Sequence, residues 1–190
     1  MGTKVIISNI IGSHAHVINP RAITPGEVEK YSLTALIAKS DHKAVAAIKA
    51  AEAAEIQKKW GGNPPAKIYS PLHDGDGVKP GTGEPYPDEC KGCFVLNLSS
   101  KKPPVVVDAL KQAIADPSQA ASGDYFNVSM DAFPYEAPGR KGVSFELLGV
   151  QVVRKGTALG MRPVADDFQV LVPSTVTVTD PDTDPDDFLN

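Results

Sequence analysis

Alternating apolar and polar residues recur along most of the chain and predict β-strands, because successive side chains of a strand point to opposite faces. The first 30 residues alternate too, but Gly12, Asn19-Pro20 and Pro25-Gly26 interrupt them. We therefore expect only one short strand there, followed by an irregular arm. The predicted strands are 5–7, 31–37, 94–98, 105–107, 125–133 and 143–153.

One segment has helical spacing instead. Between Ala44 and Trp60, apolar residues set among many alanines repeat every three to four positions. Alanine is the best helix former, and Ser40 or Asp41 offers an N-cap. The glycines and prolines that follow Trp60 end the helix. The sequence thus predicts a helix over 44–60, inserted after an early strand.

The segment 70–93 is rich in glycine and proline and predicts an extended loop. It contains Cys90 and Cys93, which are half of a zinc site, but zinc needs four ligands. The one close pair of histidines is His14 and His16, whose side chains we expect to alternate between the faces of a strand. We interpret both cysteines as incidental. The run Asp74 to Gly77 is similar to the start of a calcium loop, yet Pro85 stands where the bidentate glutamate belongs. No metal site is predicted.

About five or six strands, one helix and long loops indicate a mainly β domain. A closed or partly closed barrel removes exposed sheet edges, and the five-stranded oligonucleotide-binding (OB) barrel with an inserted helix fits these elements. The periodicity alone fits a small β-sandwich as well. We expect Phe126 and Phe145 in the core, an OB-fold domain over residues 1–172, and a linker with a disordered acidic tail over 173–190.

The acidic residues are unevenly distributed. The chain has 190 residues with 19 Lys+Arg and 23 Asp+Glu, a formal net charge of −4. Without the acids of the last 11 positions, 18 acids face 19 bases, so the body is free to carry a basic face. The tail fits an interaction segment and a solubilising end equally well. Its acidic residues are Asp180, Asp182, Asp184, Asp186 and Asp187.

The chain shows no motif of a catalytic site. It has neither a G-x-x-x-x-G-K-[ST] phosphate loop nor a G-x-S-x-G elbow, and no spacing indicates a Ser-His-Asp triad. No apolar run approaches the roughly 18 residues of a membrane helix, and no signal peptide is recognisable. We expect no enzymatic activity, no cofactor and a cytoplasmic location. A remaining alternative is a metal-dependent nuclease that uses Asp74, Asp76 and Glu84.

Aromatic and basic residues are interleaved in the second half of the chain. Tyr125, Phe133 and Tyr135 are an even number of residues apart, so on one strand their side chains point to the same face. Arg140-Lys141 follow them. Single-stranded nucleic acid is held by cations along its phosphates and by aromatic rings that stack on its bases, each worth about 1–3 kcal/mol. The residues predicted to contact single-stranded DNA are Lys39, Trp60, Tyr69, Lys101, Lys102, Tyr125, Phe133, Tyr135, Arg140, Lys141, Arg154 and Lys155.

A series of short segments occurs in a fixed order over residues 19–168. They are Lys30-Tyr31-Ser32, Lys39-Ser40-Asp41, Pro71 to Asp76, Lys101-Lys102-Pro103, Val106-Val107-Asp108, Ser122 to Tyr125, Gly142 to Leu147, Gly156 to Gly160 and Asp166-Asp167-Phe168. Together they resemble the single-stranded DNA-binding proteins of tailed bacteriophages, an OB-fold family. Two features depart from that pattern: Ala38 replaces a typical proline, and Cys90 and Cys93 replace aromatic or polar residues.

The resemblance implies a non-catalytic, sequence-independent single-stranded DNA-binding protein of phage replication, recombination or repair. Its acidic tail would bind replication or recombination proteins, with Phe188 docking in an apolar pocket. The five tail carboxylates imitate a phosphate strand and would compete for an empty basic groove. We expect no membrane contact, and homo-oligomerisation stays open. The alternative is a phage structural or assembly protein that binds no nucleic acid.

Overall fold

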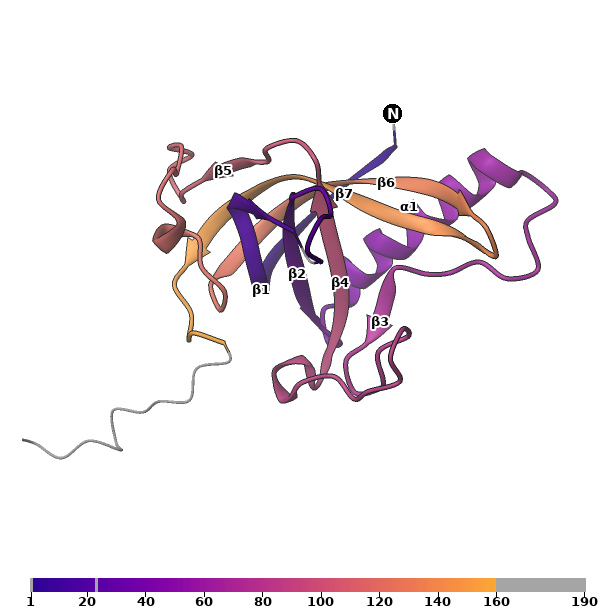
Figure 1. Cartoon of the computed structure of the whole chain (residues 1–190), viewed down its shortest axis with the longest axis horizontal. Helices are drawn as coiled ribbons and strands as arrows, with labels where there is room; N and C mark the ends of the chain where they lie inside the picture. Colours follow the sequence, from indigo (N-terminus) through magenta and orange to yellow (C-terminus); the bar gives the residue numbers. More distant parts are fainter. Residues whose placement is uncertain (1, 23, 160–190) are drawn as a thin grey trace, which may run out of the picture. The chain divides into compact units, whose positions relative to one another are not determined.

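Strands that are distant in sequence close into a barrel in the computed structural model, which describes residues 2–22 and 24–159. The strand order β3-β4-β2-β1-β6-β7-β5 is closed by an additional pairing of β4 with β7 (Figure 1). In the described part of the chain, β1, β2, β4, β7 and β6 thus form a five-stranded barrel, as predicted. The elements are β1 (Thr3–Arg21), β2 (Lys30–Ala38), α1 (His42–Trp60), β3 (Leu72–Asp74), the 3-10 helix η1 (Asp88–Cys90), β4 (Cys93–Ser100), β5 (Val105–Val107), the 3-10 helix η2 (Pro117–Gln119), β6 (Tyr125–Ala137) and β7 (Arg140–Arg154).

The closing pair of the barrel is parallel, whereas its other neighbours are antiparallel. Ser99 of β4 lies opposite Glu146 of β7 at this closure. The short β3 is antiparallel to β4 and the short β5 is parallel to β7, so both lie outside the barrel proper.

The prediction for the first 30 residues was wrong, because β1 is a strand of 19 residues. Its first half pairs with β6 and its second half with β2. Asn9 and His14 have positive φ angles of 55° and 48°, near register shifts in both pairings. Such bulges bend a strand and allow it to turn the corner of a barrel. Gly12 is required there, since a Cβ atom would lie 2.4 Å from the Phe126 ring.

Helix α1 begins two residues earlier than predicted. The Asp41 carboxylate caps it by accepting a hydrogen bond of 3.0 Å from the Ala44 backbone N–H. The apolar face of the helix packs against β1, β6 and β7 through Ala44, Ile48 and Ala51. The helix ends at Gly61, whose φ of 56° favours glycine.

The barrel interior holds the predicted aromatic core. Phe126 and Phe145 are 0% and 1% exposed and pack with aliphatic side chains of every barrel strand. Burying one such side chain stabilises the fold by about 1.5–3 kcal/mol. The prediction that both phenylalanines lie in the core is confirmed.

Two connections are more ordered than predicted. The segment between the predicted strands 125–133 and 143–153 is mostly strand, because β6 and β7 continue to the turn Pro138-Gly139 and form a long hairpin. The expected loop over 70–93 contains β3 and η1, and its Cys90 packs on the outer face of the barrel against Leu36 and Val95. No helix within the described residues is long and apolar enough to cross a membrane.

Candidate nucleic-acid interface

The outer surface of the barrel is hollowed along β1, β2, β4 and the β6–β7 hairpin. Three cavities of about 410, 340 and 560 Å³ lie there. The first two share His73 and Asn97, and the last two share His14, Thr34 and Asn97. Because neighbouring cavities have lining residues in common, they form one continuous depression, called the groove below.

Strand alternation explains the polar floor of the groove. On β2, Ser32 and Thr34 face outward between side chains of the core, and on β4 Asn97 and Ser99 do the same. The Thr34 hydroxyl donates a hydrogen bond of 2.9 Å to the Asn97 side-chain oxygen. These short polar groups leave the floor open between the bulkier walls.

Three histidines line this floor. His14 stands at the bulge of β1 and His16 two residues later, while His73 comes from β3. Burial lowers the pKa of His16 below its usual value, and Arg21 and His14 lower it further. Burial also lowers the pKa of His73, with a contribution from the Arg140 guanidinium.

The free end of the β6–β7 hairpin forms one end of the groove. Phe133, Tyr135 and Arg140 line the cavity there, and the Phe133 side chain is 40% exposed. The Arg140 guanidinium carbon lies 4.7 Å from the ring centroid of Tyr69. The Lys67 ammonium lies 4.8 Å from the same centroid. Aromatic rings and cations therefore meet at this end.

Backbone pairing brings Tyr69 to the hairpin. Its N–H donates to the Lys141 carbonyl at 2.9 Å, and its own carbonyl accepts from Val143 at 3.3 Å. The Trp60 indole N–H donates a bond of 2.8 Å to the Glu136 carboxylate, which anchors the end of α1 to β6. Six residues of the predicted interface gather at this end of the hairpin. They are Trp60, Tyr69, Phe133, Tyr135, Arg140 and Lys141.

Lys39 is predicted in the same set but is engaged elsewhere. Its ammonium lies 2.5 Å from an Asp74 oxygen and 2.6 Å from an Asp76 oxygen, and 5.6 Å from the Phe94 ring centroid. The hydrogen bonds to Asp74 and Asp76 raise the pKa of Lys39 and lower the pKa of both carboxyls. The space between these carboxylates, where the nuclease alternative needs a metal ion, is occupied by this ammonium group.

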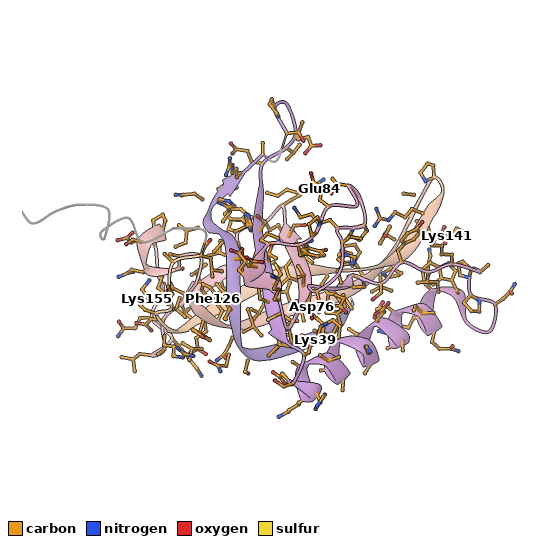
Figure 2. The ribbon with its side chains drawn as sticks, turned by 90° about the horizontal axis from the view of Figure 1, so that it is seen from below. Lys39, Asp76, Glu84, Phe126, Lys141 and Lys155 are labelled. Atoms are coloured by element: carbon orange, nitrogen blue, oxygen red, sulfur yellow. The ribbon has the colours of Figure 1, made fainter. Side chains whose placement is uncertain are left out.

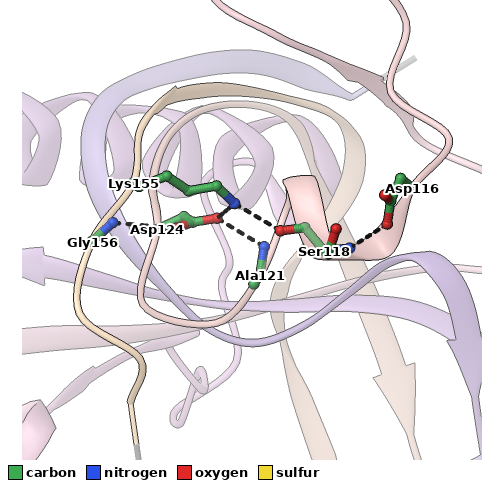
Figure 3. A network of polar contacts seen from close by, with 6 residues as sticks. All are labelled: Asp116, Ser118, Ala121, Asp124, Lys155 and Gly156. Carbon is green, nitrogen blue, oxygen red and sulfur yellow. Dashed lines mark hydrogen bonds and ion pairs between the residues drawn. The ribbon is translucent and has the colours of Figure 1, made fainter.

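Tyr125, Arg154 and Lys155 lie at the opposite end of the hairpin. Figure 2 shows Lys141 and Lys155 at opposite ends of the barrel domain. The Arg154 guanidinium carbon lies 3.3 Å from the Tyr125 ring centroid. Lys155 donates to the Ser118 carbonyl and to the buried Asp124 carboxylate, both at 2.8 Å (Figure 3). None of these three is among the described residues that line the groove.

The remaining predicted residues, Lys101 and Lys102, are exposed in the turn after β4. Neither of them is among the described residues that line the groove. The acidic tail, the linker from residue 173 and the segment 160–172 lie outside the described residues.

Sequence reasoning missed the histidines and polar groups on the groove floor. His14 and His16 are two positions apart, a spacing that places both on one face of a strand, and this was the available signal. The expectation that these two side chains alternate between the faces of a strand was wrong, because both line the same cavity. The other missed residues are Arg21, Thr34, His73 and Asn97.

Other surfaces offer less to a nucleic acid or a metal. A separate cavity of about 410 Å³ beside β5 is lined by Ile6, Val105 and mostly apolar or small groups, with Lys4 as a cation and no aromatic ring among its described residues. The residues that the structure describes contain no cluster of three metal-ligating side chains. Burial raises the pKa of the Cys90 and Cys93 thiols.

A five-stranded barrel whose outer groove combines cations with aromatic rings is characteristic of OB-fold proteins that bind single-stranded nucleic acids. The chain belongs to the family described as the single-stranded DNA-binding protein of Enterobacter phage Enc34, whose family model matches residues 3–183. The predicted resemblance to phage single-stranded DNA-binding proteins is thereby confirmed.

Solved structures show the same fold. The single-stranded DNA-binding protein from bacteriophage Enc34 in complex with single-stranded DNA is 21% identical, with a TM-score of 0.69 over 83% of this chain and 89% of that chain. Bacteriophage T7 gp2.5, a single-stranded DNA-binding protein, is 16% identical, with a TM-score of 0.54 over 89% and 96%. No curated protein matches the chain. The predicted OB fold is confirmed.

Proposed function

We propose that this protein binds single-stranded DNA in the groove, without catalysis and without preference for base sequence. The observation that carries this proposal is the hairpin end of the groove, where Phe133, Tyr135 and Arg140 line one cavity. Rings stack on any base and a guanidinium pairs with any phosphate, so both contacts tolerate every sequence.

The test is a titration of a dye-labelled oligo-dT strand with the full chain, with a duplex of equal length as the control. We expect the single strand to bind much more tightly than the duplex. Because binding releases counterions, raising the salt from 50 to 200 mM should weaken it by about tenfold or more. Equal binding of both DNAs, or of neither, contradicts the proposal. Copurification with phage particles in the latter case supports a structural or assembly role.

We further propose that the acidic tail has two tasks in phage DNA replication, recombination or repair in the host cytoplasm. It covers the empty groove, and it binds partner proteins when DNA displaces it. Leu159, at the end of the described segment, packs against the cluster of Leu36, Cys90 and Val95. Cys90 and Val95 of that cluster also line the groove. Leu159, the last residue that the structure describes, therefore lies beside the groove.

A version of the chain that ends at Thr179 tests this role of the tail. Since the truncation removes five carboxylates and no base, we expect it to bind oligo-dT more tightly, most clearly at low salt. Unchanged affinity at low salt would contradict competition and leave only the proposed contact with partner proteins.

A further inference from the structure

The central part of the groove has few permanent charges. Among the described lining residues, the Lys and Arg side chains are Arg21, Lys79 and Arg140. Arg21 and Arg140 line the two outer cavities, and the Lys79 ammonium lies 3.8 Å from a Glu84 oxygen. Phosphates that cross the centre of the groove would meet histidines and hydroxyl groups there.

Three of the four histidines of the chain line the groove, namely His14, His16 and His73. An imidazole is the side chain whose charge changes between about pH 5 and 8. We propose that these histidines are the phosphate-contacting cations of the central groove and that they take up protons when single-stranded DNA binds. This assignment rests on the proposed function of the groove.

Hydrogen bonding around His14 favours this role. The Ser13 hydroxyl donates to the Glu89 carboxylate at 2.9 Å. A hydroxyl has one hydrogen to donate, so its oxygen accepts from Nδ1–H of His14, also at 2.9 Å. This arrangement assigns the Nδ1–H form to His14 and leaves its Nε2 atom to bind an added proton.

The neighbouring charges set the direction of the effect. The cavity that His14 lines is also lined by Lys79, Tyr86 and Glu89 of the loop. The charge of Arg21 on β1 acts on His16, and that of Arg140 on β7 acts on His73. The lowered pKa values of His16 and His73 keep both imidazoles mostly neutral in the free protein at pH 7. A bound phosphate favours their charged forms and raises these pKa values, so that affinity increases as the pH falls.

Affinity for a dT strand carrying a pH-insensitive dye is measured at pH 6, 7 and 8 and at several salt concentrations. For each proton taken up, affinity should change by about tenfold per pH unit. The slope of log Kd against log salt should steepen by about 0.7 for each histidine that becomes charged. Calorimetry in two buffers of different ionisation enthalpy counts the protons directly.

The variant His14→Asn/His16→Gln/His73→Gln should lose most of this pH dependence. Asparagine tolerates the positive φ of position 14. The matched control is His42→Gln, because His42 begins α1 and lies outside the groove lining. Thermal unfolding verifies that each variant is folded.

Binding that is equally tight at pH 6 and 8, or a triple variant as pH-dependent as the parent, overturns the histidine assignment alone. Absence of binding at every pH contradicts the proposed function itself.

Discussion

The two ends of the β6–β7 hairpin carry the same kinds of residue in different surroundings. At the free end, Phe133 and Arg140 line the groove beside Tyr135. At the other end, Arg154 covers the Tyr125 ring and Lys155 is bonded to a buried carboxylate. Both ends combine rings with cations, and both were predicted to bind DNA. Of the two ends, only the free end contributes described residues to the lining of the groove.

Asp124 accounts for this difference. Its side chain is 5% exposed and accepts hydrogen bonds from Lys155 Nζ at 2.8 Å and from the N–H groups of Ala121 and Gly156 at 2.9 and 3.2 Å (Figure 3). A buried carboxylate needs such partners, because an uncompensated charge in the interior is costly. Lys155 therefore holds the start of β6 to the segments around it, whereas the Arg140 guanidinium lies over the Tyr69 ring and lines the groove.

The largest expected effect is on stability, at the Asp124 end. Asp124→Asn keeps the side-chain size but removes the charge and places an NH₂ group near backbone donors. We expect it to lower the free energy of unfolding by about 2–4 kcal/mol, measured by chemical denaturation.

The matched control is Asp116→Asn, which changes an exposed carboxylate that caps η2. Asparagine caps as well as aspartate, so this variant should differ from the parent by less than about 0.5 kcal/mol. If both substitutions cost the same, the network around Asp124 does not stabilise this end of the hairpin.

Local patterns explain why much of the fold was predictable. The barrel strands after residue 30 and α1 each follow one periodicity that the core requires. In β1, the bulges at Asn9 and His14 interrupt that periodicity, and only pairing with both β6 and β2 reveals the strand. A strand whose regularity depends on distant partners cannot be recognised from its own residues.

The groove was predictable only in part, for a related reason. The two-residue spacing of Phe133 and Tyr135 correctly predicted that both side chains lie on the outward face of β6. Whether a cation is free depends instead on contacts between distant residues, as for Lys39 with Asp74 and Asp76. No local pattern indicates these ion pairs, so the sequence does not show which of its cations are engaged within the fold.

A smaller effect, on binding, is expected from the rings. Phe133→Ala removes an exposed ring from the groove, and the loss of one stacked base is worth about 1–3 kcal/mol. We therefore expect the affinity for oligo-dT to fall by about 5- to 150-fold, whereas Phe133→Tyr should restore it. Tyr125→Ala is the equivalent change at the Asp124 end and should alter affinity less than about twofold. Equal losses from the two alanine variants would place DNA at both ends.

The smallest effect separates the two arginines. Arg140→Gln should weaken oligo-dT binding by a few fold and flatten the slope of log Kd against log salt by about 0.7, because one phosphate contact disappears. Arg154→Gln removes the same charge from the surface, yet it should leave the slope unchanged. Both variants lose one positive charge, so the long-range attraction between protein and DNA changes equally in the two, and it is screened beyond about 8–10 Å at physiological salt. A difference in the slope of log Kd against log salt therefore reports a direct contact with a phosphate. A flattened slope for Arg154→Gln alone would reverse the assignment and place the phosphates at the Asp124 end, with the free end of the hairpin left outside the path of the DNA.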